Sequence, residues 1–164
     1  LLEEAMQEIK TGQPIKIQPE PVLEIKVEAY LSGEYISDAM HKIEFYQKIA
    51  AIRNEAHISQ ITAALIDRFG EPTKATLNLL EVAKIKNIMR KLGIESIIEQ
   101  QDRLDILFGE NVNIEVENII NLQNKMQHNI RIIQGPPERI LIKLNTKNIL
   151  KYIMGLLEIL EGKQ

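Results

Sequence analysis

The spacing of hydrophobic residues divides this chain of 164 residues into two parts that meet near Gly93. Before Gly93, most apolar positions recur every three or four residues, a period that predicts amphipathic helices. After Gly93, short apolar or alternating runs predict strands, with two further helical patterns among them. The pattern therefore predicts a mainly helical first part and a mixed second part.

Residues 1–11 form the first helical pattern, and Gly12 is placed to end it, because glycine readily adopts the left-handed conformation. Prolines 14, 19 and 21 follow and predict an extended linker, since proline lacks an amide donor. We expect residues 1–21 to be the trailing helix and linker of a preceding region, and residues 22–164 to form one domain. The apolar face of the first helix comprises Leu1, Leu2, Ala5, Met6 and Ile9.

Apolar and charged residues alternate from Leu23 to Ala29, which predicts a half-buried strand. The next helix is expected to be capped by Ser37 or Asp38, whose side-chain oxygens can accept hydrogen bonds from free amides, and to run to about Ile52. Its core-facing stripe is predicted to contain Ile36, Met40, Ile43, Tyr46 and Ala50, widened by Phe45, Ile49 and Ile52.

Two more helices are predicted before Gly93. Asn54 caps the first of them, and Gly70 ends it. Pro72 and Thr73 open the second, whose apolar residues change sides about halfway along, so that it should pack against different elements at its two ends. The apolar face of the first comprises Ile58, Ile61, Leu65 and Phe69.

The second part has the predicted order ββα-ββα. Two such units in series predict one small sheet with two helices over one face. The expected fold class is α+β: a helical N-terminal part with one strand, then a small, mostly antiparallel sheet covered by helices. Strands are predicted over residues 94–99, 104–108, 130–133 and 140–144, and helices over 116–126 and from a cap at Asn145 or Thr146 to about Leu160.

Composition narrows the class of protein. Hydrophobic residues make up 45% and charged residues 26% of the chain, as in a globular domain. The absence of cysteine excludes disulfides and thiolate metal sites, and no apolar run approaches the ~20 residues of a membrane span, so we expect a cytoplasmic protein. The net charge of −3 gives no general reason to bind nucleic acid, although it does not exclude a local basic patch.

No catalytic constellation is evident in the sequence. The eight glycines are scattered singly, whereas a phosphate-binding loop needs them clustered. The three histidines lie far apart; His41 and Glu44 span one helical turn, which a solvated helix face explains better than a metal site. We therefore expect no catalytic, cofactor-binding or metal-binding residues.

Charged residues near the end of the helix before Gly70 are the candidate site. Asp67 and Arg68 lie between the apolar residues Leu65 and Phe69. They form either a surface charge pair, with the arginine favoured near a helix C-terminus, or a patch that faces a partner. The following helix is basic but has no interleaved aromatic residues to stack bases. Its basic residues are Lys74, Lys84, Lys86, Arg90 and Lys91.

One series of motifs is more specific than these patterns. Residues 65–70 (LIDRFG), 78–80 (NLL) and 91–94 (KLGI) resemble, in order and spacing, the C-terminal domain of bacterial transcription-repair coupling factors. The upstream run over residues 29–50 (AYL, YI and FYQKIA) resembles the same family. Residues 1–10 resemble the helix that precedes this domain there, at the end of the motor region.

The resemblance is strong over residues 23–94 and rests over residues 95–164 on the alternation of elements and apolar positions. Ala64 stands where the family often has an acidic residue one turn before Asp67, which removes one charge from any acidic contact surface. Other departures are His41 and Lys42 in place of a usual arginine, and Thr73 in place of a usual proline.

The resemblance implies a parent that is an ATP-hydrolysing DNA translocase of helicase superfamily 2, with ATP and magnesium bound in motor domains outside this chain. Such a parent binds RNA polymerase stalled at a lesion, displaces it and recruits nucleotide excision repair. The domain itself is implied to be regulatory and non-catalytic: it folds back on the N-terminal module, masks the surface that binds the damage-recognition protein and restrains the motor. We expect Asp67, Arg68, Glu71 and Lys74 to contribute to that interface.

Two other functions are left open by the residues. One is a nucleic-acid-binding accessory domain of a helicase, which the net charge and the missing aromatic platform disfavour. The other is a small enzyme of unknown type, whose pocket of titratable groups only a structure would reveal.

Overall fold

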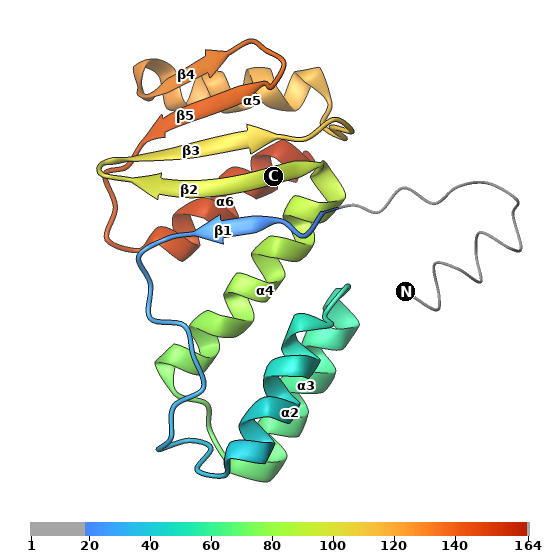
Figure 1. The fold of residues 1–164 in the computed structure, drawn as a ribbon. Helices are drawn as coiled ribbons and strands as arrows, with labels where there is room; N and C mark the ends of the chain where they lie inside the picture. The colour runs from blue at the N-terminus through green and yellow to red at the C-terminus, as the bar shows by residue number, and fades with distance from the viewer. Residues whose placement is uncertain (1–18, 164) are drawn as a thin grey trace, which may run out of the picture.

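The structure is a computed structural model that describes residues 19–163, so the helix expected over residues 1–11 lies outside the described residues. Within 19–163 the chain forms five α-helices, one short 3₁₀ turn and one five-stranded mixed sheet (Figure 1). The expected α+β class is confirmed, and so is the order ββα-ββα after Gly93. No helix in this range is long and apolar enough to cross a membrane.

The first part contains α2 (Ala39–Ala50), α3 (Glu55–Phe69) and α4 (Lys74–Leu92). Each helix begins after a residue whose side chain accepts a hydrogen bond from an amide of the first turn, which satisfies a donor that the helix leaves free. Gly93 ends α4 in the left-handed region at φ +79°, as glycine readily does. The three capping residues are Asp38, Asn54 and Thr73.

The sheet has the strand order β1-β2-β3-β5-β4. The first strand pairs in parallel with the second, and all other neighbours are antiparallel, which confirms a mostly antiparallel sheet. Its strands are β1 (Val22–Glu24), β2 (Ile94–Gln100), β3 (Arg103–Phe108), β4 (Ile130–Ile133) and β5 (Arg139–Lys143).

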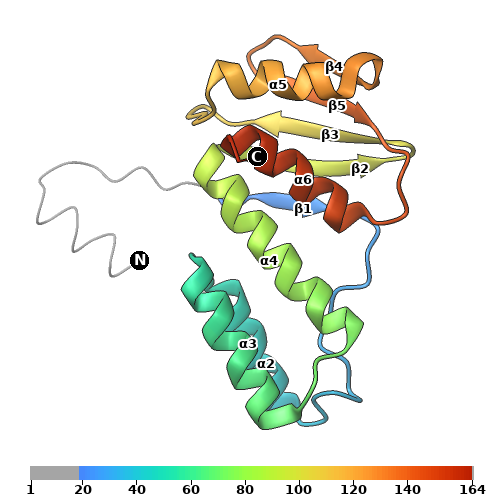
Figure 2. The ribbon, with the colours of Figure 1, turned by 180° about the vertical axis from the view of Figure 1, so that it is seen from behind.

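Helices cover only one face of this sheet. The register aligns Ile97, Ile106 and Ile140 across three strands, so these buried side chains share the covered face. Three helices lie on this face: α5 (Val116–Met126), α6 (Ile149–Glu161) and the C-terminal half of α4 (Figures 1 and 2). The sequence predicted only the first two of them there. The other face has no layer over it within residues 19–163.

Two hydrophobic cores share helix α4. The larger lies between the sheet and the helices on it and includes Ile85 and Met89 of α4. The smaller joins α2 and α3 to the start of α4 and includes Leu80. The prediction that this helix packs against different elements at its two ends is confirmed.

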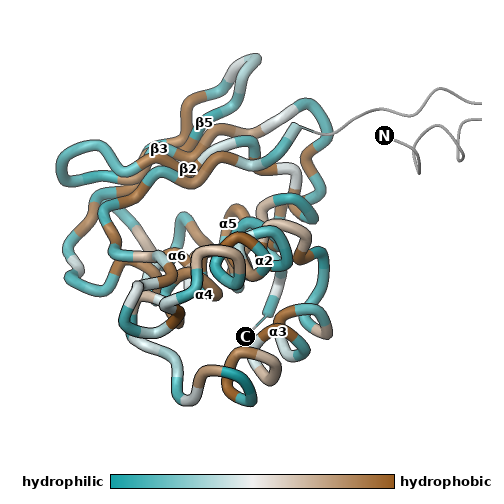
Figure 3. Tube along the Cα trace, turned by 60° about the horizontal axis from the view of Figure 1, so that its bottom comes forward, coloured by the Kyte–Doolittle hydropathy of each residue, from teal (hydrophilic) through white to brown (hydrophobic). Residues whose placement is uncertain are grey.

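Hydrophobic stretches gather along β2, β3 and β5 (Figure 3).

The predicted core-facing stripe of α2 is wrong at Met40, Ile43, Tyr46 and Ala50, whereas Ile36 and the widening residues Phe45, Ile49 and Ile52 are buried as predicted. The helix buries Phe45 and Ile49 against α3 and α4, whereas Met40, Ile43 and Tyr46 are 71%, 50% and 39% exposed. The helix is apolar on two sides, and its neighbours cover only the side that carries Phe45. The pattern alone could not show which side that is.

Two element boundaries also differ from the prediction. The strand expected over residues 23–29 pairs only through Glu24, because the chain bends at Lys26, whose amide donates to Oε1 of Glu99 at 2.7 Å. The last helix is capped by Asn148, not by Asn145 or Thr146: Oδ1 of Asn148 accepts from the first-turn amide of α6 at 3.2 Å.

Candidate partner-binding site

Arg68 is the centre of a packed cluster between α3 and α2. Its Nη1 lies 2.8 Å from Oε2 of Glu44, and its guanidinium stacks 5.2 Å from the ring centre of Phe45 and 5.1 Å from that of Phe69. Lys48 contacts the same carboxylate oxygen at 3.1 Å. The ion-pair partner of Arg68 is therefore a residue of the neighbouring helix and not the adjacent aspartate.

The charge of Glu44 is fixed by these contacts. Hydrogen bonds from Lys48 and then from Arg68 hold the pKa of the Glu44 carboxyl below its ordinary value, because they stabilise the ionised form. The carboxylate is thus fully ionised at neutral pH. Among residues 19–163, no group of three or more His, Cys, Asp or Glu side chains is placed to hold a metal ion.

Aromatic contacts make the end of α3 rigid. The ring of Phe69 packs edge-on against Phe45 at 5.5 Å and against Tyr35 at 5.9 Å, an arrangement that aromatic quadrupoles favour. The Tyr35 hydroxyl donates to the carbonyl of Gly70 at 2.8 Å, and burial together with the charge of Glu71 raises its pKa. The chain is therefore held where it leaves the helix.

The other three candidate residues are exposed. Asp67, Glu71 and Lys74 lie at the corner where α3 turns into α4, and none has a hydrogen bond or ion pair between side chains within residues 19–163. The structure brings Arg68 together with Glu44, and within residues 19–163 no side-chain hydrogen bond or ion pair joins the four candidates to one another. What it does provide is a rigid corner with free charges of both signs.

Sequence reasoning missed the residues that support this corner. Glu44 and Lys48 have the spacing of a helical i, i+4 ion pair, which could have been recognised. No sequence pattern indicated the contact between Glu44 and Arg68, because it joins two helices whose relative rotation the hydrophobic pattern does not define. No pattern indicated the role of Tyr35 either.

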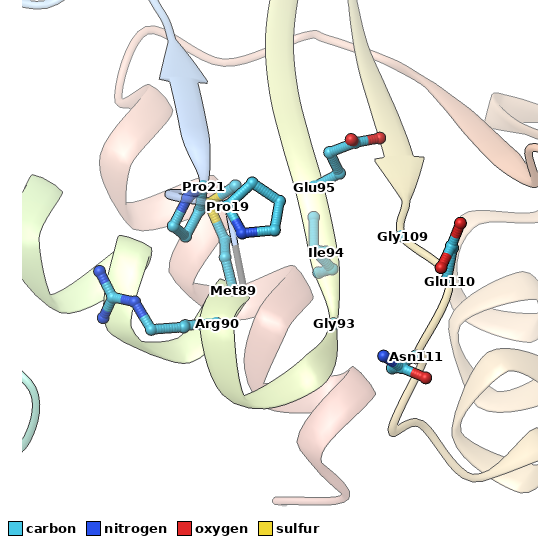
Figure 4. Close-up of a pocket in the computed structure, with 10 residues that line it drawn as sticks. All are labelled: Pro19, Pro21, Met89, Arg90, Gly93, Ile94, Glu95, Gly109, Glu110 and Asn111. Atoms are coloured by element: carbon cyan, nitrogen blue, oxygen red, sulfur yellow. The ribbon is translucent and has the colours of Figure 1, made fainter. Parts of the chain in front are cut away.

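A pocket of about 480 Å³ lies at the other end of α4, between the start of β1 and the loop after β3 (Figure 4). In Figure 4 the guanidinium of Arg90 points away from the carboxylates of Glu95 and Glu110, which lie on the other side of the pocket. Arg90 instead pairs with Glu20 at 3.0 Å. The one arginine of the pocket lining is thus engaged by a carboxylate that does not itself line the pocket.

Comparison with known proteins identifies the family. The TRCF domain matches residues 25–119, more than half of the chain. Transcription-repair-coupling factors are 31% identical over 109 residues in Myxococcus xanthus (66% of this chain, 9% of that protein) and 27% identical over 140 residues in Escherichia coli (83% and 12%). The factor of Bacillus subtilis is 24% identical over 165 residues (99% and 14%). The chain thus spans about a tenth of the length of these relatives.

A solved structure has the same fold. The crystal structure of the C-terminal domain of a transcription-repair coupling factor superposes with a TM-score of 0.72 at 28% sequence identity. The match covers 88% of this chain and 96% of that one, so it includes both the helical part and the sheet. The chain therefore belongs to the TRCF family, as the C-terminal domain of a transcription-repair coupling factor.

Proposed function

We propose that this domain is non-catalytic and autoinhibitory, and that it masks the surface of its parent that binds a nucleotide-excision-repair protein. The parent is proposed to be a cytoplasmic, ATP-driven DNA translocase, with ATP and Mg²⁺ in motor domains outside this chain, that displaces stalled RNA polymerase. Family membership supports this proposal through the names of the relatives. Masking is attributed to contact between the domain and the N-terminal repair-protein-binding module.

The observation that carries the masking proposal is the contrast between Asp67 and Arg68. Packing and the Glu44 ion pair hold Arg68 in place, while the neighbouring carboxylate is exposed and without a polar partner in the described chain. A free charge on a rigid support suits a releasable contact, because exposed charges set specificity at an interface that must also open. Glu71 and Lys74 extend the same corner.

The test is the charge reversal Asp67→Arg in the full-length protein. If the corner holds the domain against the N-terminal module, Asp67→Arg should raise both the affinity for the repair protein and the basal ATPase rate. A contact with a coupling free energy of about 1–2 kcal/mol corresponds to a rise of about five- to thirtyfold. Repair-protein binding by titration and ATP turnover without polymerase measure the two effects.

Glu158→Arg is the matched control, since Glu158 is an exposed carboxylate on α6, in the sheet part of the molecule. It makes the same change in net charge and should alter neither quantity. If Asp67→Arg has the wild-type affinity for the repair protein and the wild-type ATPase rate, the corner is not part of the masking contact.

One observation favours the second candidate, a nucleic-acid-binding accessory role. On the uncovered face of the sheet, Arg103 lies directly opposite Lys143, an arrangement that costs free energy unless an anion offsets it. Arg131 lies on the same face two positions further along the next strand. Fluorescence anisotropy with DNA at low salt tests this role: binding that Arg103→Glu abolishes and salt weakens steeply supports it, and no binding excludes it.

A further inference from the structure

The uncovered face of the sheet carries an apolar band that belongs to neither hydrophobic core. Side chains alternate along a strand, so the neighbours of the buried Ile97, Ile106 and Ile140 point to the uncovered side. Each of the five strands places one aliphatic residue there; Val22 is 42% exposed, and the other four are half-buried. The band consists of Val22, Ile98, Leu107, Ile133 and Leu141.

The charges within this band balance one another. Nε of Arg139 lies 3.1 Å from Oδ1 of Asp105, so the ion pair near the centre of the face has no net charge. Glu24 and Arg131 stand at the two edges of the face, on β1 and β4, with one charge of each sign. The band as a whole is therefore electrically neutral.

The two ends of the strands, in contrast, carry opposite charges. At one end Arg103 lies directly opposite Lys143; both side chains are exposed, and neither has an ion pair within residues 19–163. From this end to Glu110, just beyond the other end of β3, the chain spans about 20 Å, against a Debye length of about 8 Å at physiological ionic strength. The two ends of one copy therefore cannot neutralise each other.

The acidic end is built around a hollow of about 720 Å³ between the loops after β3 and before β5. Its lining includes Glu95, Glu110 and Glu138, all exposed, and contains no cation from the described chain. Figure 4 shows two of these carboxylates, Glu95 and Glu110, near Gly109 at the end of β3. One face thus combines a neutral apolar centre with a basic and an acidic end.

We propose that this face binds the same face of a second copy of the chain, in a dimer whose twofold axis crosses the strands. Such an axis reverses the strand direction, so that each basic end lies over the acidic end of the other copy and the two apolar bands meet between them. Arg103 then lies near the partner's Glu110, and Lys143 near the partner's Glu138. In an isologous interface each of these contacts occurs twice.

The charge pattern selects this axis over the alternative. A twofold axis along the strands would set Arg103 against its own copy, and like charges in direct opposition cost free energy. The crossing axis leaves like charges only at the sheet edges, at Glu24 and Arg131, where the rotation of about 30° between two packed sheets moves them apart. The proposal goes beyond the masking role and does not depend on it.

The size of the face predicts a weak dimer. Five strands about 4.8 Å apart, the central ones about 17–24 Å long, present about 400–500 Å² per copy, or about 1,000 Å² in total. This is below the standard size of a stable interface and in the range of transient ones. We therefore expect a monomer–dimer equilibrium with a dissociation constant above about 1 μM, weakened by salt.

Sedimentation equilibrium of the whole chain at low and high salt measures this association. We expect Arg103→Glu and Glu110→Arg each to weaken it at least about tenfold, because each reverses one partner in two symmetry-related contacts. The double variant Arg103→Glu/Glu110→Arg exchanges the two charges and should restore the dissociation constant to within about threefold of wild type. Glu158→Arg, at an exposed position of α6 on the covered side, makes the same change in net charge as Glu110→Arg and should have no effect.

A chain that stays monomeric up to about 1 mM at low salt overturns the proposal. So does a dimer that the single variants leave unchanged, or one that the double variant does not restore. An assembly that Arg103→Glu disrupts and Glu110→Arg strengthens would identify nucleic acid as the occupant of the basic end, and this too would overturn the dimer. None of these measurements involves ATP or the repair protein, so their failure leaves the masking proposal untouched.

Discussion

Arg68 combines two roles that a lysine could not combine. Its planar guanidinium lies against the rings of Phe45 and Phe69 while it still reaches the carboxylate of Glu44. A lysine ammonium keeps the charge but has neither the flat surface nor the fork of donors. The residue thereby connects the two helices of the hairpin through both packing and charge.

Replacement of Arg68 should therefore separate these roles. Arg68→Ala removes the stacking on two rings, and we expect the free energy of unfolding to fall by about 1 kcal/mol, since a cation–π contact at a partly exposed site contributes about 0.5–1 kcal/mol. Arg68→Lys should recover less than half of that loss. Urea denaturation measures both variants. Full recovery by lysine would show that charge alone matters.

The depressed pKa of Glu44 predicts a pH dependence of stability. A carboxyl whose pKa is lower in the folded than in the unfolded state contributes stability above its unfolded pKa of about 4.5, and the contribution is lost as the pH falls through the folded pKa. Wild type should therefore be more stable than Glu44→Gln at pH 6, and the difference should shrink steadily below about pH 4.5. Denaturation at a series of pH values tests this, and a constant difference would contradict it.

Most helix caps and glycine stops were predictable at the residue scale, although the cap of α6 is Asn148 and not Asn145 or Thr146, and cross-helix pairs were not predictable. Asn54 and Gly70 act on their own helix, so their local sequence defines their role. The partner of Arg68 depends on how α2 is rotated against α3. The sequence pointed to the α3 corner through a motif, but the exposure of Asp67 beside a fixed arginine became visible only in the structure.

At the scale of elements, Gly93 joins α4 to β2 where another backbone segment comes close. A Cβ atom at this position would collide with the backbone carbonyl of Asn111, a contact that no rotamer change can relieve. Gly162, after α6, has a similar left-handed conformation at φ +83°, but a Cβ there would lie 3.0 Å from the flexible side chain of Asn118.

These two glycines form a matched pair for a stability prediction. Gly162→Ala should cost about 1 kcal/mol, the strain of a left-handed alanine. Gly93→Ala adds the backbone collision, and we expect a loss on the order of 3 kcal/mol. Thermal or urea unfolding distinguishes them. Equal losses would mean that the loop at Asn111 moves aside freely.

Helix α2 shows why a strong pattern still placed half of the predicted core residues on the wrong side of the helix. Apolar residues lie on both sides of it, so a stripe through Met40 and Ile43 is as regular as the stripe through Phe45 and Ile49. Only the positions of α3 and α4 decide between them. Strands after Gly93 were easier to predict, because each apolar run there is short and bounded by turn residues. Their order in the sheet was not predictable, since it depends on pairing between distant segments.

On the scale of the whole molecule, the two cores differ in size and depend on one helix. The core of the α2–α3 hairpin is the smaller of the two, and the sheet core draws side chains from strands and from three helices. Because local opening is easiest where few apolar contacts must be broken, the hairpin should open before the sheet.

Native-state hydrogen exchange should show this order. We expect the amide of Leu65 in α3 to have an opening free energy at least about 1 kcal/mol below that of Ile106 in β3. Leu65→Ala removes a fully buried side chain, which typically costs about 2–5 kcal/mol, and should lower the protection of the hairpin much more than that of the sheet. Identical opening free energies in both places would show that the cores unfold as one unit.

The continuity of α4 has a mechanical consequence. Its first residue, Lys74, stands at the charged corner, and Arg90 in its last turn holds Glu20 where the chain enters the domain. The helix is about 28 Å long and has no proline or glycine within it, so it transmits displacement as a stiff lever. A displacement of the corner by a few ångströms is therefore expected to move Glu20, about a helix length away, because α4 has no hinge between the two.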